Sequence, residues 1–422
     1  MRKAGEEMHR LITRLYPICR SITGNGLRET LQIIREHIPI DLHEVPSGMR
    51  VFDWTIPPEW NVRDAWVKNA AGERLIDFKE SNLHVVSYSA PVRARLRFSE
   101  LRPHLFTAPA NPEWIPYRTT YYKEDWGFCL SENRLRRFRE GEEYEVLIDS
   151  SLEPGHLTYG ELCLPGQQSE KVLISSHVCH PSLANDNLSG IAVAVELARH
   201  LATRSRRYSY RFLFPPGTIG AIAWLARNQQ ILPLIRHGLV LSCVGDPAPL
   251  TYKRTRQGDA EIDRIVEYVL SQSGEPHMVI GFAPDGYDER QYNSPGINLP
   301  VGCLMRSRNA QFPEYHTSAD NLEFVCSGKL EETLFKCLSI IDLLEANRVY
   351  WNRNPNCEPQ LSRRGVWPDA AQNEKRLALL WVLNLSDGRH ALLDIATRSG
   401  LPFSLIKEAA ARLAEVDLLS PQ

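Results

Sequence analysis

The sequence lacks the features expected of a membrane-spanning or disulfide-bonded protein. No run approaches the ~18 consecutive apolar residues that a membrane helix needs, and the N-terminal segment has no apolar core typical of a signal peptide. The nine cysteines are odd in number and include no Cys-x-x-Cys pair, which fits reduced thiols better than a disulfide framework. We therefore expect a cytoplasmic protein with no membrane partner.

An excess of charge of one sign is also missing. Lys and Arg number 49 and Asp and Glu number 51, so the formal net charge is -2. This balance argues against nucleic acid or an anionic membrane as the main partner. The 422 residues, 43% hydrophobic and 24% charged, have an ordinary globular composition, and the length predicts about two or three domains.

Hydrophobic periodicity divides the chain into domains that differ in their predicted secondary structure. Residues 1–40 and 160–350 predict an α/β core, in which helices flank a mixed sheet. Residues 41–159 contain five of the nine Trp and many short alternating runs, which predict an inserted, mostly β domain. Residues 351–373 are polar and contain Pro, as linkers do, and 374–422 predict the short helices of a winged helix.

The densest group of polar side chains runs from Ser175 to Gly190, between a predicted buried strand and a predicted helix. Ligands bind at the C-terminal ends of strands in such sheets, and the imidazoles and carboxylate present here suit Zn²⁺. The alternative is that Asp186 caps the helix and that His177 and His180 are ordinary loop residues.

Two later segments strengthen the metal interpretation. Asp246 follows another apolar strand, and His316 lies in a polar segment late in the α/β region. Each alone is more often a turn or loop residue. Together with His177 and Asp186 they give four potential ligands at predicted strand ends of one α/β unit, which favours one or two zinc positions.

These segments resemble the zinc aminopeptidase superfamily, whose members bind two zinc ions. The resemblance implies that His177, Asp186, Asp246 and His316 are metal ligands, with Asp186 in the bridging position. The whole chain also resembles an uncharacterised bacterial aminopeptidase-like family that combines this core with an inserted β domain and a C-terminal winged helix. Segments 51–57, 176–190, 288–292 and 312–321 carry that narrower resemblance most closely.

The chain departs from the superfamily pattern at two places. The first motif, H-x-D, has Cys179 in its third position, followed by His180; a packed thiol and a hydrogen-bonding imidazole are the plain alternatives to a chemical role. The narrower family has a Glu in a P-E-T-I-G segment, where this chain has Gly217. Losing a general base costs roughly 10²–10⁴-fold, so we expect weak peptide hydrolysis and a gain of at least ~10²-fold from Gly217→Glu. His180 and Glu289 are the candidate substitutes for the base.

Five further residues are candidates for binding substrate. In the superfamily, the loop that resembles the one carrying Asp288 borders the substrate pocket, and Arg side chains can pair with a substrate carboxylate through two hydrogen bonds. Ordinary ion pairs within the protein are the alternative for the two Arg. The candidates are Asp288, Arg290, Tyr292, Arg306 and Tyr315.

The function that these residues predict is a zinc-dependent metallopeptidase or hydrolase of aminopeptidase type, acting on a peptide or small amide. One alternative is a non-hydrolytic metal- or ligand-binding protein, and another is a regulator whose winged helix reads DNA. The candidate recognition helix, residues 403–415, carries Lys407 and Arg412 but also Glu408 and Glu415, which is not the basic face that phosphate binding needs. We therefore favour a packing or homo-oligomerisation role for it.

Overall fold

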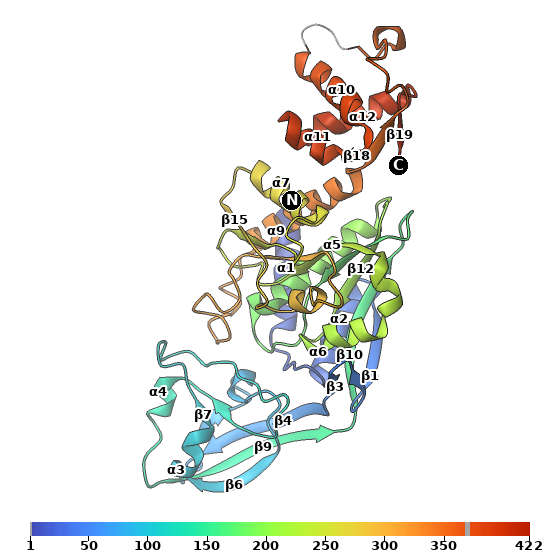
Figure 1. The fold of residues 1–422 in the computed structure, drawn as a ribbon. Helices are drawn as coiled ribbons and strands as arrows, with labels where there is room; N and C mark the ends of the chain where they lie inside the picture. The colour runs from blue at the N-terminus through green and yellow to red at the C-terminus, as the bar shows by residue number, and fades with distance from the viewer. Residues whose placement is uncertain (1, 368–371) are drawn as a thin grey trace. The chain divides into compact units, whose positions relative to one another are not determined.

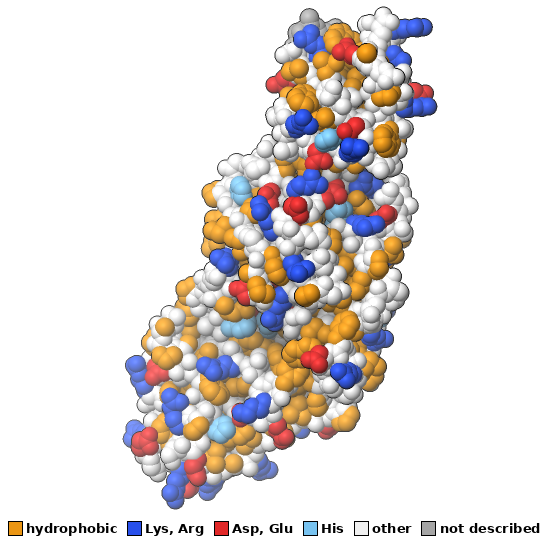
Figure 2. All heavy atoms as spheres, in the orientation of Figure 1, with side chains coloured by type: hydrophobic (Ala, Val, Ile, Leu, Met, Phe, Trp, Pro, Cys, Tyr) orange, Lys and Arg blue, Asp and Glu red, His pale blue; other side chains and the backbone are white. Residues whose placement is uncertain are grey.

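The computed structural model describes residues 2–367 and 372–422, and Figure 1 traces their path. The chain forms two compact units, Met1–Leu338 and Ser339–Gln422. Among the described residues, none of the helices combines the length and the apolar character needed to cross a membrane. Positive and negative side chains are interspersed on the face shown in Figure 2, as the balanced composition predicts.

The first unit is built on an eight-stranded mixed sheet, which confirms the predicted fold class. Its strand order is β1-β10-β12-β11-β13-β16-β14-β15. The neighbours β12, β11, β13 and β16 are parallel, whereas the β1–β10, β10–β12 and β14–β16 pairs are antiparallel. The bounds are β1 Asp41–Pro46, β10 His156–Leu164, β11 Lys171–Ser175, β12 Ser209–Phe214, β13 Ile235–Leu241, β14 Leu250–Lys253, β15 His277–Ile280 and β16 Val301–Met305.

Helices cover this sheet because its central strands are apolar on both faces. Val172, Leu173 and Ile174 of β11 are all buried, as in strands that lie between two layers of helices. Helix α1 packs on α5, and α2 packs on α5 and β10, so the N-terminal helices contact elements of the α/β core. The bounds are α1 Arg2–Leu15, α2 Asn25–His37, α5 Gly190–Ala202, α6 Ile219–Arg227, α7 Glu261–Gln272, α8 Glu289–Tyr292 and α9 Ser327–Ala346.

The inserted domain contains a four-stranded antiparallel sheet of order β5-β4-β9-β6 (Figure 1). The expected boundaries at 41 and 159 move inward, because β1 and β10 pair with each other inside the core sheet. The bounds are β2 Arg50–Val51, β3 Trp54–Thr55, β4 Glu59–Lys68, β5 Arg74–Asp77, β6 Val92–Arg97, α3 Phe98–Leu101, β7 Leu105–Phe106, β8 Phe128–Cys129, α4 Glu132–Leu135 and β9 Glu143–Glu153.

One loop of the inserted domain is hydrogen-bonded to a loop of the core. The backbone N–H of Tyr117 donates to the carbonyl of His316 at 2.7 Å, and the N–H of Ser318 donates to the carbonyl of Ile115 at 2.8 Å. Pro116 and Thr317 form an isolated antiparallel bridge between the same segments. The β domain therefore contributes residues directly beside His316.

The second unit has the helices and the small antiparallel sheet of a winged helix. Strand β17 lies between β18 and β19, and it takes in the first residues of the expected 351–373 linker. Residues 368–371 of that linker lie outside the described residues. The exposed helix face of α12 is mixed in charge, and its Glu408 pairs with Lys375 at 3.5 Å. The bounds are β17 Val349–Asn352, α10 Asn373–Leu385, β18 Asp387–Ala391, α11 Leu392–Ser399, α12 Phe403–Glu415 and β19 Leu419–Pro421.

We predict that Glu59 stabilises the junction between core and insert in a pH-dependent way. Its carboxylate accepts hydrogen bonds from Arg28 of α2 and from the backbone of His156, and the Arg28 bond lowers the pKa of Glu59 to about 2. Because the folded pKa lies below the unfolded value of about 4.3, the stabilisation is present above that pH and is lost as the pH falls towards 2. Glu59→Gln should lower the free energy of unfolding by about 1–3 kcal/mol at pH 7.

Urea denaturation at several pH values measures this effect. The difference between Glu59→Gln and the unaltered chain should shrink as the pH falls from 4 to 2. Asp149→Asn is the control, because Asp149 and Arg63 form an ion pair that is exposed and contributes little. An equal loss for Glu59→Gln at all pH values would contradict the prediction.

Candidate functional site

The candidate site is a buried carboxylate surrounded by three imidazoles. The Oδ1 of Asp186 lies 2.9 Å from Nε2 of His177, and its Oδ2 lies 3.2 Å from Nδ1 of His180 and 3.1 Å from Nε2 of His316. The side chains of His177, His180 and Asp186 are buried, whereas 31% of the His316 side chain is exposed. The structure thus brings together segments that are about 130 residues apart in the chain.

The sequence positions these groups through strand ends and a short helical turn. His177 follows β11, and Asp186 lies in the π-helical turn η3, Ala184–Ser189, directly before α5. The carboxylate of Asp320 accepts hydrogen bonds from the backbone N–H groups of Asn185 at 2.5 Å and Asp186 at 2.9 Å. Asp320 therefore holds the turn that presents Asp186 to the imidazoles.

Burial and the carboxylate determine the protonation of the imidazoles. Burial lowers the pKa of His177 to about 4, and burial likewise lowers the pKa of His316. Burial opposes a charge on His180, but the negative charge of Asp186 outweighs it and raises the pKa of His180.

The structure brings three of the four predicted ligands, His177, Asp186 and His316, together with His180. Among the described residues, His177, His180 and Asp186 offer ligand atoms within 4.8 Å of one another and form a group that could hold a metal. Neither His316 nor Asp246 belongs to this group of three, but His316 contacts Asp186. The oxygens of Asp246 accept hydrogen bonds from the Asn185 amide at 2.8 Å and from both the backbone N–H and the hydroxyl of Ser307. His180, a candidate substitute for the base in the sequence, lies beside the Asp186 carboxylate.

Gly217 lies beside the site, and a tyrosine ring occupies the space next to it. A Cβ atom at position 217 would lie 2.0 Å from Cε1 of Tyr287, so no larger side chain fits without moving that ring. The Tyr287 ring packs on His177 with 3.8 Å between ring centroids. The gain expected from Gly217→Glu therefore requires the Tyr287 ring to move.

Tyr287 also connects the two unusual residues of the first motif. Its hydroxyl lies 3.0 Å from Nε2 of His180 and 3.2 Å from Sγ of Cys179, and that thiol is buried and also faces the carbonyl of Gly217. The sequence analysis did not identify Tyr287, because it belongs to none of the recognised motifs. The one feature that could have pointed to it is its position next to Asp288.

Glu289, a candidate base, is occupied elsewhere. One oxygen accepts from Lys253 Nζ at 2.9 Å and the other from the backbone N–H of Tyr287 at 3.1 Å. Glu289 therefore anchors the loop that carries Tyr287. Asp288 is different, because both of its buried oxygens lack a hydrogen-bond partner, and burial raises the pKa of Asp288 to about 8.

The other candidate substrate residues divide between the site and the protein interior. Tyr315 stacks on His316 with 4.0 Å between ring centroids, so it lies at the site. Tyr292 is buried and its hydroxyl lies 2.8 Å from that of Ser175. Arg306, predicted to bind substrate, is instead bonded within the protein. It is buried, donates to the carbonyls of Ala248 and Lys329, and pairs with Glu332. Arg290 is exposed.

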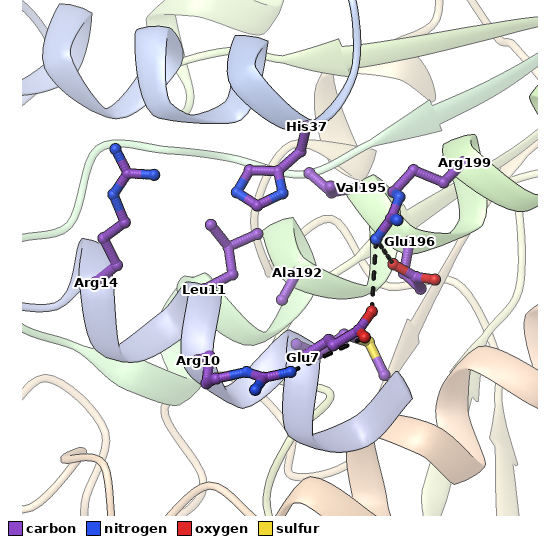
Figure 3. A pocket seen from close by; sticks show the side chains of 10 residues that line it. Glu7, Arg10, Leu11, Arg14, His37, Ala192, Val195, Glu196 and Arg199 are labelled. Atoms are coloured by element: carbon purple, nitrogen blue, oxygen red, sulfur yellow. Dashed lines mark hydrogen bonds and ion pairs between the residues drawn. The ribbon is translucent and has the colours of Figure 1, made fainter. Parts of the chain in front are cut away.

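A separate hollow between α1, α2 and α5 has no part in this site (Figure 3). Its volume is about 400 Å³, and its charged side chains are largely paired. Arg199 pairs with Glu196 at 2.9 Å and with Glu7 at 3.6 Å, and Arg14 pairs with Glu36. The charged groups of this hollow therefore serve the packing of helices.

Comparison with known proteins agrees with the fold and with the arrangement of domains. Residues 9–347 match a family model described as "Domain of unknown function (DUF4910)", and residues 348–421 match a winged helix-turn-helix model. The chain belongs to the DUF4910 family. Family membership covers the α/β core together with its inserted domain, and the winged helix is confirmed for the C-terminal unit.

Two matches from Clostridium acetobutylicum, a relative found by sequence and a solved structure, cover nearly the whole chain. One, named for polysaccharide biosynthesis and an aminopeptidase-like domain, is 52% identical over 99% of this chain and 96% of its own length. The other is a crystal structure described as that of a peptidase, with 52% identity and a TM-score of 0.94 over 100% of this chain and 97% of its own. A zinc aminopeptidase from Bacillus subtilis, 13% identical, shares the fold with a TM-score of 0.58 over 81% and 94% of the chains.

We predict that the position of the Tyr287 ring requires glycine at position 217 for full stability. Gly217→Ala should lower the free energy of unfolding by about 1–3 kcal/mol, because the added methyl group would overlap the ring. The same substitution should cost much less in a Tyr287→Ala background, where the space is free. A double-mutant cycle in urea measures the coupling.

Gly281→Ala is the matched control, since a Cβ there meets nothing within 4 Å. If Gly217→Ala cost no more than Gly281→Ala, or cost the same with and without Tyr287, the proposed steric relation would be wrong.

Proposed function

We propose that the chain is a metal-dependent hydrolase of aminopeptidase type that binds zinc through His177, His180, Asp186 and His316. The observation that carries this proposal is the Asp186 carboxylate with three imidazole nitrogens within 3.2 Å. Imidazole nitrogen and carboxylate oxygen are ligands that Zn²⁺ takes in proteins, so the residues present fit the ion. The chemistry supplied by bound zinc is polarisation of an amide carbonyl and acidification of a water molecule.

The protein groups around the ligands orient and screen them. Tyr315 stacks on His316, and Tyr287 packs on His177 and contacts His180, so the rings hold three imidazoles in place. Neither carboxyl oxygen of Asp288 has a hydrogen-bond partner among the described residues. We propose that this carboxylate forms an ion pair with the amino group of the substrate. A buried carboxyl group raised in pKa would ionise on pairing with that ammonium.

The substrate that we propose is an amide attached to a sugar. The relative named for polysaccharide biosynthesis carries an aminopeptidase-like domain and matches this chain over nearly its full length. An amide on a saccharide satisfies both parts of that name, whereas a free peptide satisfies only one.

The second candidate function is ligand binding without hydrolysis. It is favoured by the Tyr287 ring, which packs on His177 and fills the space where the side chain of a residue at position 217 would begin. A protein of this kind would bind metal at the same four residues but would turn over no amide. Turnover, rather than metal content, distinguishes the two functions.

We predict that the purified chain retains about one zinc per chain by elemental analysis. His180→Gln and Asp186→Asn should each lower the zinc content at least tenfold, because each removes a ligand atom from the cluster. His237→Gln, at a buried histidine of β13, is the control and should keep the metal. Loss of zinc in Asp246→Asn but not in His180→Gln would favour the ligand set expected from sequence instead.

We predict slow hydrolysis of aminoacyl-anilides by the unaltered chain and no gain from Gly217→Glu alone. Gly217→Glu combined with Tyr287→Ala should raise kcat/KM by at least ~10²-fold, because the carboxylate then has room beside His177. Tyr287→Ala alone is the control for opening the site. If the single Gly217→Glu variant reached the rate of the double variant, Tyr287 would not be the obstacle.

A further inference from the structure

A row of aromatic side chains leads from the surface of the inserted domain to the candidate site. Trp54, 43% exposed, lies 5.1 Å from Tyr122, which is 55% exposed, as measured between ring centroids. Tyr122 is followed by Tyr121, whose hydroxyl lies 2.9 Å from that of Tyr117. The Tyr117 ring lies 5.3 Å from His180 and 5.1 Å from His316.

The exposed end of this row borders a pocket of about 380 Å³. Aromatic and polar side chains alternate around it. Trp126 is fixed by stacking on His104 at 3.7 Å, and Arg118 lies over the Phe106 ring at 4.7 Å. The lining includes Phe106, Arg118, Thr120, Tyr121, Tyr122 and Trp126.

The Trp54 hairpin belongs to the 51–57 segment, whose role the catalytic cluster does not explain. The side chains of Phe52 and Trp54 are both more than 40% exposed, although both are large and apolar. Exposed aromatic rings that are grouped beside a pocket with polar groups are typical of a binding surface.

We propose that this aromatic pocket, defined by Tyr121, Tyr122 and Trp126 with Trp54 at its edge, binds the sugar ring of the substrate. A pyranose ring has an apolar face of C–H groups, which packs on an aromatic ring, and a rim of hydroxyl groups. The pocket offers aromatic surface for the face and Arg118 and Thr120 for the rim. The inference rests on the proposed function, because the amide of the bound saccharide is what reaches the cluster.

Other ligands fit these features less well. An aromatic peptide side chain would favour a closed apolar pocket, whereas half of this lining is polar and open to water. A nucleotide phosphate would favour a cluster of free cations, but Lys123 is paired with Asp125 at 3.0 Å. A saccharide uses both kinds of surface together.

The volume and position agree with this choice. A volume of about 380 Å³ lies at the lower end of the usual range for small-ligand sites, which suits one or two sugar rings. Tyr121, which lines the pocket, has its hydroxyl 2.9 Å from that of Tyr117, and the Tyr117 ring packs edge-on against the imidazoles of His180 and His316. The pocket is therefore connected to the cluster through two adjoining tyrosines.

The test is calorimetric titration of the full chain with tri-N-acetylchitotriose, with maltotriose as a second saccharide probe. We expect measurable binding of at least one probe, and Tyr122→Ala should weaken it about tenfold through loss of the ring. Tyr122→Phe should retain most of the affinity, because the ring face remains. Phe335→Ala removes another exposed aromatic residue, on α9, and should leave binding unchanged.

The same titration on His180→Gln separates the two proposals. Saccharide binding that survives this substitution, together with no turnover of any amide by the unaltered chain, would leave the sugar site standing while the hydrolase function fails. No binding of either probe, or binding that Tyr122→Ala does not weaken, would overturn the sugar site. Binding of triphenylalanine or of uridine monophosphate that depends on Tyr122, with no saccharide binding, would also overturn it.

Discussion

The structure of the site depends on one buried negative charge. The carboxylate of Asp186 is almost fully removed from water, and a buried charge is costly unless polar partners surround it. Those partners come from the loop after β11 and from the segment around His316. Asp320, on the latter segment, also holds the backbone of the turn that presents Asp186. One interaction therefore ties together loops that are distant in the chain.

The inserted domain is part of this arrangement. Its 115–117 segment pairs with 316–318 by backbone hydrogen bonds, so the β domain borders the histidine that is most open to solvent. Tyr117 then packs edge-on against two imidazoles. An insertion that contacts the site in this way can change which substrates enter without altering the residues that would hold a metal.

This chain has Gly217 where the expected pattern has a glutamate, and the Tyr287 ring lies in the space beside it. At position 217 the backbone comes so close to Tyr287 that a side chain larger than that of glycine requires the ring to move, and the same tyrosine contacts His177, His180 and Cys179. Gly217 and the Cys179–His180 pair looked like separate departures in the sequence. In the structure they belong to one set of contacts, because Tyr287 lies between them.

The sequence by itself determined the elements that depend on local pattern. Periodicity and strand-end motifs predicted the mixed sheet, the winged helix, and the positions of His177, Asp186 and His316, because burial patterns and turns are encoded by neighbouring residues. Only the tertiary structure decided that His180 joins the cluster, that Asp246 and Arg306 bond within the protein, and that Tyr287 fills the space beside Gly217. These outcomes depend on distances between segments far apart in sequence, which no local pattern specifies.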